Sequence, residues 1–380
     1  MPPGITQILD MLGVPVENDL SFHALLRRVC SRLRDGSRRL AAALAQRGFG
    51  LPYQVAQLPA RVVTKAFYGA ELLASFTPRW QAAVARVNTV QYEVAKMLLA
   101  GGPGVSLGTG GHVRALAETR MLTRWGTTLM QRIVLGRARL LALPPGSPVA
   151  QVVAGTRATT GATWLDHAAE VTRALGITND FPADTLSEAA RADPVARKRA
   201  VKHWKHSVVL PAVQAYEQAW FVLQLGAVGT GGLIPYRELI PVRGPLSPGV
   251  RWAPWGRTMW RYYQAWALAR ASGRLPVEVW VDEGGAAPPS ACPLCAAPAP
   301  VGCTLVECLG HLLSACPAVA PLREACSSSD VVRWALGDAE DIATLAPRVR
   351  LVGLASRAWA LGARAGAAGA VGAAREEGGG

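Results

Sequence analysis

The sequence has little charge for its length, and its first residues are not those of a secreted protein. Only 17% of the 380 residues are charged, against about a quarter in a typical soluble chain. Half are hydrophobic, which is enough to bury a substantial core and excludes wholesale disorder despite 39 glycines and 27 prolines. The first residues, Met1 to Gly4, lack the basic and apolar regions of a secretory signal.

Long hydrophobic runs are also absent. The longest apolar-leaning stretch without charge, 218–236, contains Gln224, Pro235 and four glycines, and is therefore a poor candidate for a membrane span. Cysteine is nearly confined to one segment, since six of the seven lie between Cys292 and Cys326, whereas a secreted disulfide framework would spread them along the chain. We expect an intracellular protein, nuclear or cytoplasmic, with no membrane partner.

The motifs of common enzymes are missing or incomplete. No segment fits a P-loop or the dinucleotide-binding G-x-G-x-x-G pattern. Gly104, Ser106 and Gly108 match the G-x-S-x-G nucleophile elbow, but a helical pattern and a glycine-rich loop stand where that motif needs a strand. We interpret the segment as a turn and keep an esterase built on Ser106 as a third possibility. His203 and His206 are interpreted as solvated or phosphate-facing.

Basic residues are concentrated in three blocks, 27–39, 112–139 and 191–205, each with six lysines or arginines against one acidic residue. All three have helical periodicity, and in the first block Val29 and Leu33 belong to an apolar stripe with arginines around it. One such block is usually only a solvated face, but three together favour phosphate contact and nucleic acid as the partner. The candidate contacts are Arg27, Arg28, Arg32, Arg38, Arg39, Arg120, Arg124, Arg197, Lys198, Arg199, Lys202 and Lys205.

A segment rich in tryptophan adds two further candidates. Four of the twelve tryptophans fall among arginines between 251 and 270, a combination that stacks unpaired bases while holding phosphates. Trp260, Tyr263 and Trp266 share one face of a predicted helix, and we assign them to the core instead. Arg257 and Arg261 remain candidate contacts to a nucleic-acid backbone.

The hydrophobic periodicity predicts a mainly α-helical protein with a disordered Ala/Gly-rich C-terminus beyond residue 362. A possible strand covers 276–281, and Asp330 or Ser329 is expected to cap a short helix. The predicted helices cover 26–44, 55–74, 78–100, 112–143, 163–175, 186–225 with interruptions at Pro194 and Pro211, 258–271, 330–336 and 348–362.

The clustered cysteines predict a zinc site. Cys292, Cys295, His311 and Cys316 have the spacing C-x2-C-x15-H-x4-C. In this arrangement two thiolates of a tight turn face one ion, and a histidine and a cysteine five residues apart complete the tetrahedron. Four protein ligands leave no open position for an activated water, so we expect a structural rather than a catalytic metal.

Three further cysteines leave alternatives open. Cys303 and Cys308 could replace His311 and Cys316 as ligands. They could also bind a second ion together with Cys326, although that second site would have no obvious fourth ligand.

Several stretches match, in order, a known family. These are Leu12-Gly13-Val14, Leu20-Ser21-Phe22, the arginine-rich helix and Tyr68-Gly69-Ala70-Glu71. Further on, Glu307 precedes His311 by four residues, aliphatic residues and Cys316-Pro317 follow, and Arg323 trails them. Together they resemble the region that follows the polymerase palm in reverse transcriptases of non-LTR (LINE-type) retrotransposons. Gly310 departs from the acidic residue common there, and Cys303 and Cys308 are additional.

The resemblance covers most of residues 10–325, and it implies a helical thumb, a linker region and a CCHC zinc knuckle. In such proteins these parts help to grip template RNA or target DNA during target-primed reverse transcription. The family's polymerase needs paired aspartates that hold two metal ions, and this sequence contains no Asp-Asp pair. The acidic residues after Cys316 have no following lysine, so a P-D…(D/E)-x-K nuclease is not supported either.

We therefore expect a nucleic-acid-binding fragment of such a reverse transcriptase, not catalytic alone, with zinc as its only cofactor. The alternative is a helical, zinc-containing scaffold for protein–protein interaction. The expected regions are a thumb-like helical region 1–145, a basic helical region 146–225, a Pro/Gly-rich linker 226–256, an aromatic helix with the CCHC zinc module 257–326, and short helices with a low-complexity tail 327–380.

Overall fold

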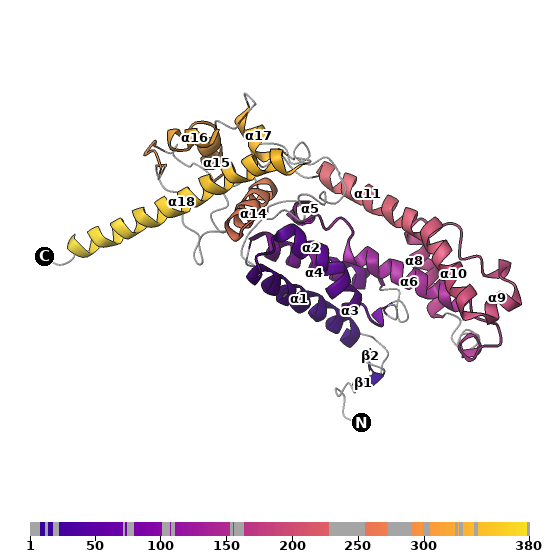
Figure 1. Ribbon diagram of the computed structural model, residues 1–380. Helices are drawn as coiled ribbons and strands as arrows, with labels where there is room; N and C mark the ends of the chain where they lie inside the picture. Colours follow the sequence, from indigo (N-terminus) through magenta and orange to yellow (C-terminus); the bar gives the residue numbers. More distant parts are fainter. Residues whose placement is uncertain are drawn as a thin grey trace. The chain divides into compact units, whose positions relative to one another are not determined.

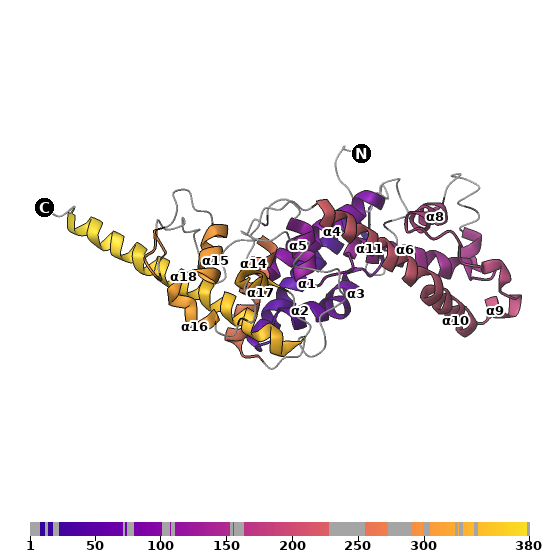
Figure 2. The same cartoon turned by 90° about the horizontal axis from the view of Figure 1, so that it is seen from above.

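The protein, represented by a computed structural model, is mainly α-helical, as the sequence predicts (Figures 1 and 2). In the part of the chain that the structure describes, no helix is long and apolar enough to span a membrane. The described residues are 8–11, 14–17, 23–70, 73, 80–100, 107, 111–152, 155, 163–227, 255–272, 291–292, 294–298, 305–323, 326, 330–337 and 341–377.

Most helices lie within or near the predicted ranges, whereas those at 305–314 and 320–323 lie outside them. The helices are α1 (His23–Gln46), α2 (Leu51–Leu58), α3 (Thr64–Ala66), α4 (Trp80–Ala100), α5 (Gly111–Glu118), α6 (Trp125–Leu141), α8 (Trp164–Ala174), α9 (Glu188–Ala192), α10 (Pro194–Trp204), α11 (Leu210–Ala227), α14 (Arg257–Ser272), α15 (Leu305–Ser314), α16 (Ala320–Arg323), α17 (Val331–Leu336) and α18 (Ile342–Glu377). Two π-helical segments, Pro59–Val63 and Lys205–Val209, precede α3 and α11.

The chain divides into two compact units, each assembled from three stretches. The first unit contains Met1–Arg39, Gln57–Gln91 and Thr123–Trp220. In it α6 packs against both α8 and α10, and both views in Figures 1 and 2 place these helices together. The second unit contains Leu40–Ala56, Tyr92–Leu122 and Phe221–Gly380.

In the first unit, α4 side chains hold the start of α6. Asn88 Oδ1 accepts a hydrogen bond from the Gly126 N–H at 2.8 Å, and Gln91 Oε1 accepts one from the Trp125 N–H at 2.6 Å. These acceptors satisfy N–H groups that have no partner within their own helix. Gly126 is needed here because a Cβ at this position would lie 2.6 Å from Asn88 Oδ1.

In the second unit, α14 forms the centre and packs against α18, α5 and α17. Trp260, Tyr263 and Trp266 are buried, which confirms the prediction that they belong to the core. Tyr262 on α14 also lies against Gly353 of α18, where a Cβ would come within 2.4 Å of the tyrosine ring. The absence of a side chain therefore lets these two helices approach closely.

A buried ion pair joins α14 to α5 in the second unit. Arg270 is 2% exposed, and its Nε lies 3.1 and 3.2 Å from the two carboxylate oxygens of Glu118. Its guanidinium also donates to the Leu336 carbonyl at the end of α17 and lies over the Trp266 ring. Because burial of a charge is costly unless it is paired and hydrogen-bonded, this arginine makes α5, α14 and α17 depend on one another.

The predicted helix over 112–143 is two helices in the structure. α5 ends at Glu118, and Arg120 follows in the left-handed region with φ 58°. Met121 N–H then bonds back to the Leu116 carbonyl at 2.9 Å, a closing pattern typical of helix C-termini. Hydrophobic periodicity continues across the break, so it could not reveal this end.

Pro194 and Pro211 behave differently from each other. Pro194 opens α10, and the Asp193 side chain caps that helix by accepting from Val195 and Ala196 N–H, so the predicted interruption is confirmed. Pro211 does not interrupt the helical course. A π-helical segment, Lys205–Val209, precedes it, a local rearrangement suited to a residue that has no N–H to donate.

The two ends of the chain also differ from expectation. β1 (Ile8–Met11) and β2 (Val14–Glu17) pair as an antiparallel hairpin with Ile8 opposite Glu17; each strand has four residues, too few for alternation to be recognised. α18 continues to Glu377, past residue 362, beyond which the sequence predicts disorder. Alanine has the highest helix propensity, and no proline follows Pro347, so the glycines alone do not stop the helix.

The short helix after the cysteines is confirmed. Asp330 caps α17, and its side chain accepts from the Arg333 N–H at 2.9 Å. Three predicted features lie outside the described residues: the turn with Ser106, most of the linker 226–256 and the strand 276–281.

Candidate functional site

The first half of the candidate metal centre is a tight turn that carries Cys292 and Cys295. The Cys292 N–H donates to the Ala297 carbonyl at 2.8 Å, and its own carbonyl accepts from the Ala296 N–H at 2.9 Å. A single antiparallel bridge between Ala291 and Pro298 closes the base of this turn. Ala296 has a positive φ of 56°, a conformation that costs an L-residue free energy, so the turn holds Cys295 in place at some strain.

The second half comes from the end of α15. His311 lies in its last turn, while Leu309, Leu312 and Leu313 are fully buried and fix the helix in the second unit. The helix ends because the His311 carbonyl accepts both the Ala315 and the Cys316 N–H at 2.8 Å. Cys316 is thereby placed immediately beside the histidine.

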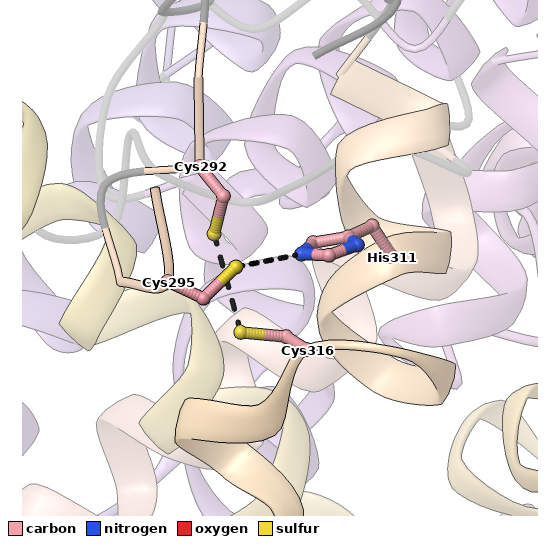
Figure 3. A group of neighbouring side chains, drawn as sticks. All are labelled: Cys292, Cys295, His311 and Cys316. Atoms are coloured by element: carbon pink, nitrogen blue, oxygen red, sulfur yellow. Dashed lines mark hydrogen bonds between the residues drawn. The ribbon is translucent and has the colours of Figure 1, made fainter. Parts of the chain in front are cut away.

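These elements bring together the four residues that the sequence analysis selected (Figure 3). One potential ligand atom from each of Cys292, Cys295, His311 and Cys316 lies within 4.8 Å of all the others. The Sγ atoms of Cys292 and Cys316 are 4.0 Å apart, and Cys295 Sγ is 3.4 Å from His311 Nε2. The side chains point toward one common centre in Figure 3.

The distances fit a tetrahedral metal site. Zinc–sulfur and zinc–nitrogen bonds of about 2.3 and 2.05 Å give tetrahedral edges of about 3.8 Å between two sulfurs and about 3.6 Å between sulfur and nitrogen. The two observed separations, 4.0 and 3.4 Å, each differ from these edges by about 0.2 Å. The arrangement therefore needs little movement to hold one ion.

The protonation of the two turn cysteines differs. Burial raises the pKa of the Cys292 thiol to about 11. The backbone N–H of Ala297 lowers the pKa of Cys295, because it hydrogen-bonds the sulfur and stabilises the thiolate. Without an ion the buried Cys292 is a thiol at neutral pH, so metal binding at this cluster would release a proton.

Arg323 supports the cluster without belonging to it. Its Nη1 donates to the Cys316 carbonyl at 2.9 Å and to the Leu312 carbonyl at 3.4 Å. The arginine thus links the end of α16 to the segment that carries the ligands. The family resemblance includes Arg323 as a trailing residue but does not indicate this role.

The remaining cysteines are only partly described. Cys303 and the side chain of Cys308 lie outside the described residues. Cys326 is half-buried and does not belong to the cluster of four. Cys30 is buried on α1 in the other unit.

Comparison with known proteins adds no further assignment. No protein-family model, curated protein or solved structure matches the chain.

Most candidate nucleic-acid contacts on α1 and α10 face solvent. Val29 and Leu33 of α1 are buried as predicted. The exposed candidates on these two helices are Arg27, Arg32, Arg38, Arg39, Lys198, Arg199 and Lys202, while Arg28, Arg197 and Lys205 are half-buried. All lie in the first unit.

Some of the selected cations have partners within the protein. Arg197 donates to the carbonyls of Arg191 and Ala192 at the end of α9. In the second unit, Arg257 and Arg261 are exposed on α14, and Arg257 donates to the Gln46 carbonyl at 3.4 Å. A carbonyl oxygen does not neutralise a guanidinium. Arg197 and Arg257 therefore keep a positive charge that can attract a phosphate.

The prediction that Arg124 contacts nucleic acid is wrong. It is 7% exposed, and its Nε lies 3.0 Å from Glu217 Oε1 on α11. Glu217 also accepts hydrogen bonds from the Arg124 N–H and the Thr127 hydroxyl, and the guanidinium lies over the Trp220 ring at 4.2 Å. A buried and paired arginine serves the fold, so we remove Arg124 from the phosphate contacts.

The rest of block 112–139 is also largely structural. Arg114 is buried and donates to the Ala271 carbonyl, and Arg137 is paired with Asp180. Arg132 lies over Phe67, whereas Arg120 is half-buried. The three blocks have equal charge in the sequence but differ in the exposure of their basic side chains. Those of α1 and α10 are mostly exposed to solvent, whereas most of those in block 112–139 contact other parts of the protein.

Proposed function

We propose that this chain is a zinc-containing, nucleic-acid-binding protein. It corresponds to the part of a non-LTR retrotransposon reverse transcriptase that follows the catalytic palm. The convergence of Cys292, Cys295, His311 and Cys316 is the observation that carries the proposal. Its zinc would be structural, since four protein ligands fill a tetrahedral coordination shell.

Zinc is the metal that this donor set favours. Three thiolates and one imidazole form a Cys3His site of the kind that binds zinc, and magnesium and calcium prefer oxygen donors instead. Such a site stabilises a small module that has few other contacts to hold it. At this site the short turn of Cys292 and Cys295 would be tied to α15 through the metal.

The nucleic-acid part of the proposal rests on α1 and α10. Seven exposed lysines and arginines on these helices offer charge to a sugar-phosphate backbone. The partner would be template RNA or target DNA, read through its phosphates and without sequence specificity. The missing Asp-Asp pair makes polymerisation by this chain alone chemically unsupported.

Charge reversal tests the binding. Arg27, Arg28, Arg32, Lys198 and Lys202 are replaced by Glu, and the affinity for single-stranded RNA and DNA is measured by fluorescence polarisation at several salt concentrations. The wild type should show a steep salt dependence, and this variant should lose binding. If all five side chains contact phosphates, they account for about 3.5 of the salt slope of the wild type, because each contact to a single strand contributes about 0.7.

A second variant controls for net charge. Arg47, Arg61, Lys65, Arg139 and Arg173 are exposed and lie off α1 and α10. Their replacement by Glu changes the total charge equally and should weaken binding much less. Equal losses in both variants, or wild-type binding with no salt dependence, would contradict the proposal and favour a protein-interaction scaffold.

A further inference from the structure

A basic hollow lies on the surface of the first unit between α1 and the first half of α4. Its volume is about 220 Å³, and it is lined by His23, Leu26, Arg27, Cys30, Ser31, Arg34 and Arg86. All seven residues belong to the first unit. Arg86 comes from α4, and it was absent from the three basic blocks of the sequence.

The seven lining residues include three arginines from two helices and no carboxylate. Arg27 and Arg34 come from α1, and Arg86 comes from α4. Arg86 is exposed and forms no ion pair with any described carboxylate. The nearest acid on α1, Asp35, is half-buried and accepts a hydrogen bond from the Ser31 hydroxyl at 2.7 Å.

The spacing along α1 suits a chain of phosphates. His23, Arg27, Cys30 and Arg34 follow at intervals of four, three and four residues, so they share one face of the helix. At 1.5 Å per residue, Arg27 and Arg34 are about 10 Å apart along the helix axis. A strand advances about 3.4 Å per phosphate along the axis of a duplex, and an unpaired strand can extend further, so this distance covers at most about three phosphates.

The size of the hollow indicates what can enter. Pockets that enclose a small organic ligand usually have about 300–1,000 Å³, and this hollow is smaller. It accommodates a phosphate group more readily than a whole buried nucleotide. Guanidinium groups suit this ligand because their planar N–H donors match two phosphate oxygens at once.

We propose that the hollow of Arg27, Arg34 and Arg86 binds the backbone phosphates of single-stranded nucleic acid. This inference rests on the proposed function, and it names the site at which α1 and α4 jointly bind the strand. Arg86 adds a cation from a second helix, so α1 and α4 would both contact the backbone.

The test substitutes the two arginines of the hollow that the five-site charge-reversal variant leaves unchanged. Arg34→Gln and Arg86→Gln are measured singly and together against a labelled single-stranded RNA and a DNA of the same sequence. Each single variant should bind about tenfold more weakly, since a hydrogen bond to a charged group contributes about this factor. Each should also reduce the salt slope by about 0.7.

Two controls separate this site from general charge and from misfolding. Arg139→Gln removes one exposed cation of the same unit on α6, and it should change affinity less than twofold. Arg86→Lys keeps the charge but not the planar fork, and it should keep the salt slope while losing part of the affinity. Circular dichroism and thermal melting must match the wild type for every variant compared.

The outcomes distinguish this inference from the proposed function. One outcome would reject the hollow and keep the proposed function. In it, the wild type binds with a steep salt dependence and the five-site reversal abolishes binding, but Arg34→Gln and Arg86→Gln bind like the wild type. If the wild type shows no salt-dependent binding, both fail. Binding to phosphatidylserine vesicles with none to either oligonucleotide would also overturn the inference.

Discussion

The buried pair of Arg270 and Glu118 provides the sharpest stability prediction. Replacing Glu118 by Ala leaves the Arg270 guanidinium buried without its carboxylate. The side chain of Arg270 is fully buried and that of Glu118 is 3% exposed, so water cannot take the place of the lost partner. Removal of one partner from such a pair costs about 3–5 kcal/mol.

Two further contacts of Arg270 are made to uncharged groups. The Leu336 carbonyl and the Trp266 ring stay in place, but neither neutralises the cation. A unit of this size loses about 2–4 °C in melting temperature per kcal/mol. Glu118→Ala should therefore lower the melting temperature of the second unit by about 6–20 °C, measured by scanning calorimetry.

A double variant tests the reason for this loss. Glu118→Leu combined with Arg270→Met removes both charges and keeps apolar volume, so it should be much closer to the wild type than Glu118→Ala is. A double-mutant cycle then gives the coupling between the two positions. A shift below about 2 °C for Glu118→Ala, or a double variant as unstable as the worse single one, would refute the reasoning.

Three further predictions follow from single sites. Arg124→Gln should lower the melting temperature and leave the RNA affinity of the folded protein unchanged, because Arg124 is paired with Glu217; weaker binding at an unchanged melting temperature would contradict this. Ala296→Gly should strengthen metal binding by up to about 1 kcal/mol in a chelator competition, because glycine adopts positive φ without strain; weaker binding would be the opposite result. Hydrogen bonds from the Thr344 N–H and hydroxyl lower the pKa of Asp341. The ionised carboxylate therefore stabilises the folded protein above the unfolded-state pKa, and this contribution is lost as pH falls below about 4. Asp341→Asn should flatten the acid limb of a pH–stability curve, and an unchanged limb would exclude this contribution.

The helices could be predicted where apolar spacing and caps agree. Asp330 precedes an apolar turn and caps α17, and Thr163 with Asp166 forms a capping box at the start of α8. Ends that depend on tertiary contacts could not be predicted in this way. The start of α6 is held by Asn88 and Gln91 of another helix, and no local pattern contains that information.

The metal cluster could be predicted because its ligands lie close together in the chain. Spacing alone brings two cysteines of one turn near each other, and His311 and Cys316 follow within one helix end. The basic surface was harder, because charge in a sequence does not reveal which side of a helix is covered. Arg124 belongs to a basic block and is buried, whereas Arg86 lies outside the three blocks and lines a hollow.

The metal content of the purified protein tests the central claim most directly. Zinc per chain is measured by mass spectrometry in the wild type and in Cys316→Ala, with Cys326→Ala as a matched control because Cys326 lies outside the cluster. Cys303→Ala and Cys308→Ala test the alternative ligand sets. We predict one zinc per chain in the wild type and in the three variants outside the cluster, and almost none in Cys316→Ala. A wild type without zinc, or Cys316→Ala with a full complement, would contradict the account.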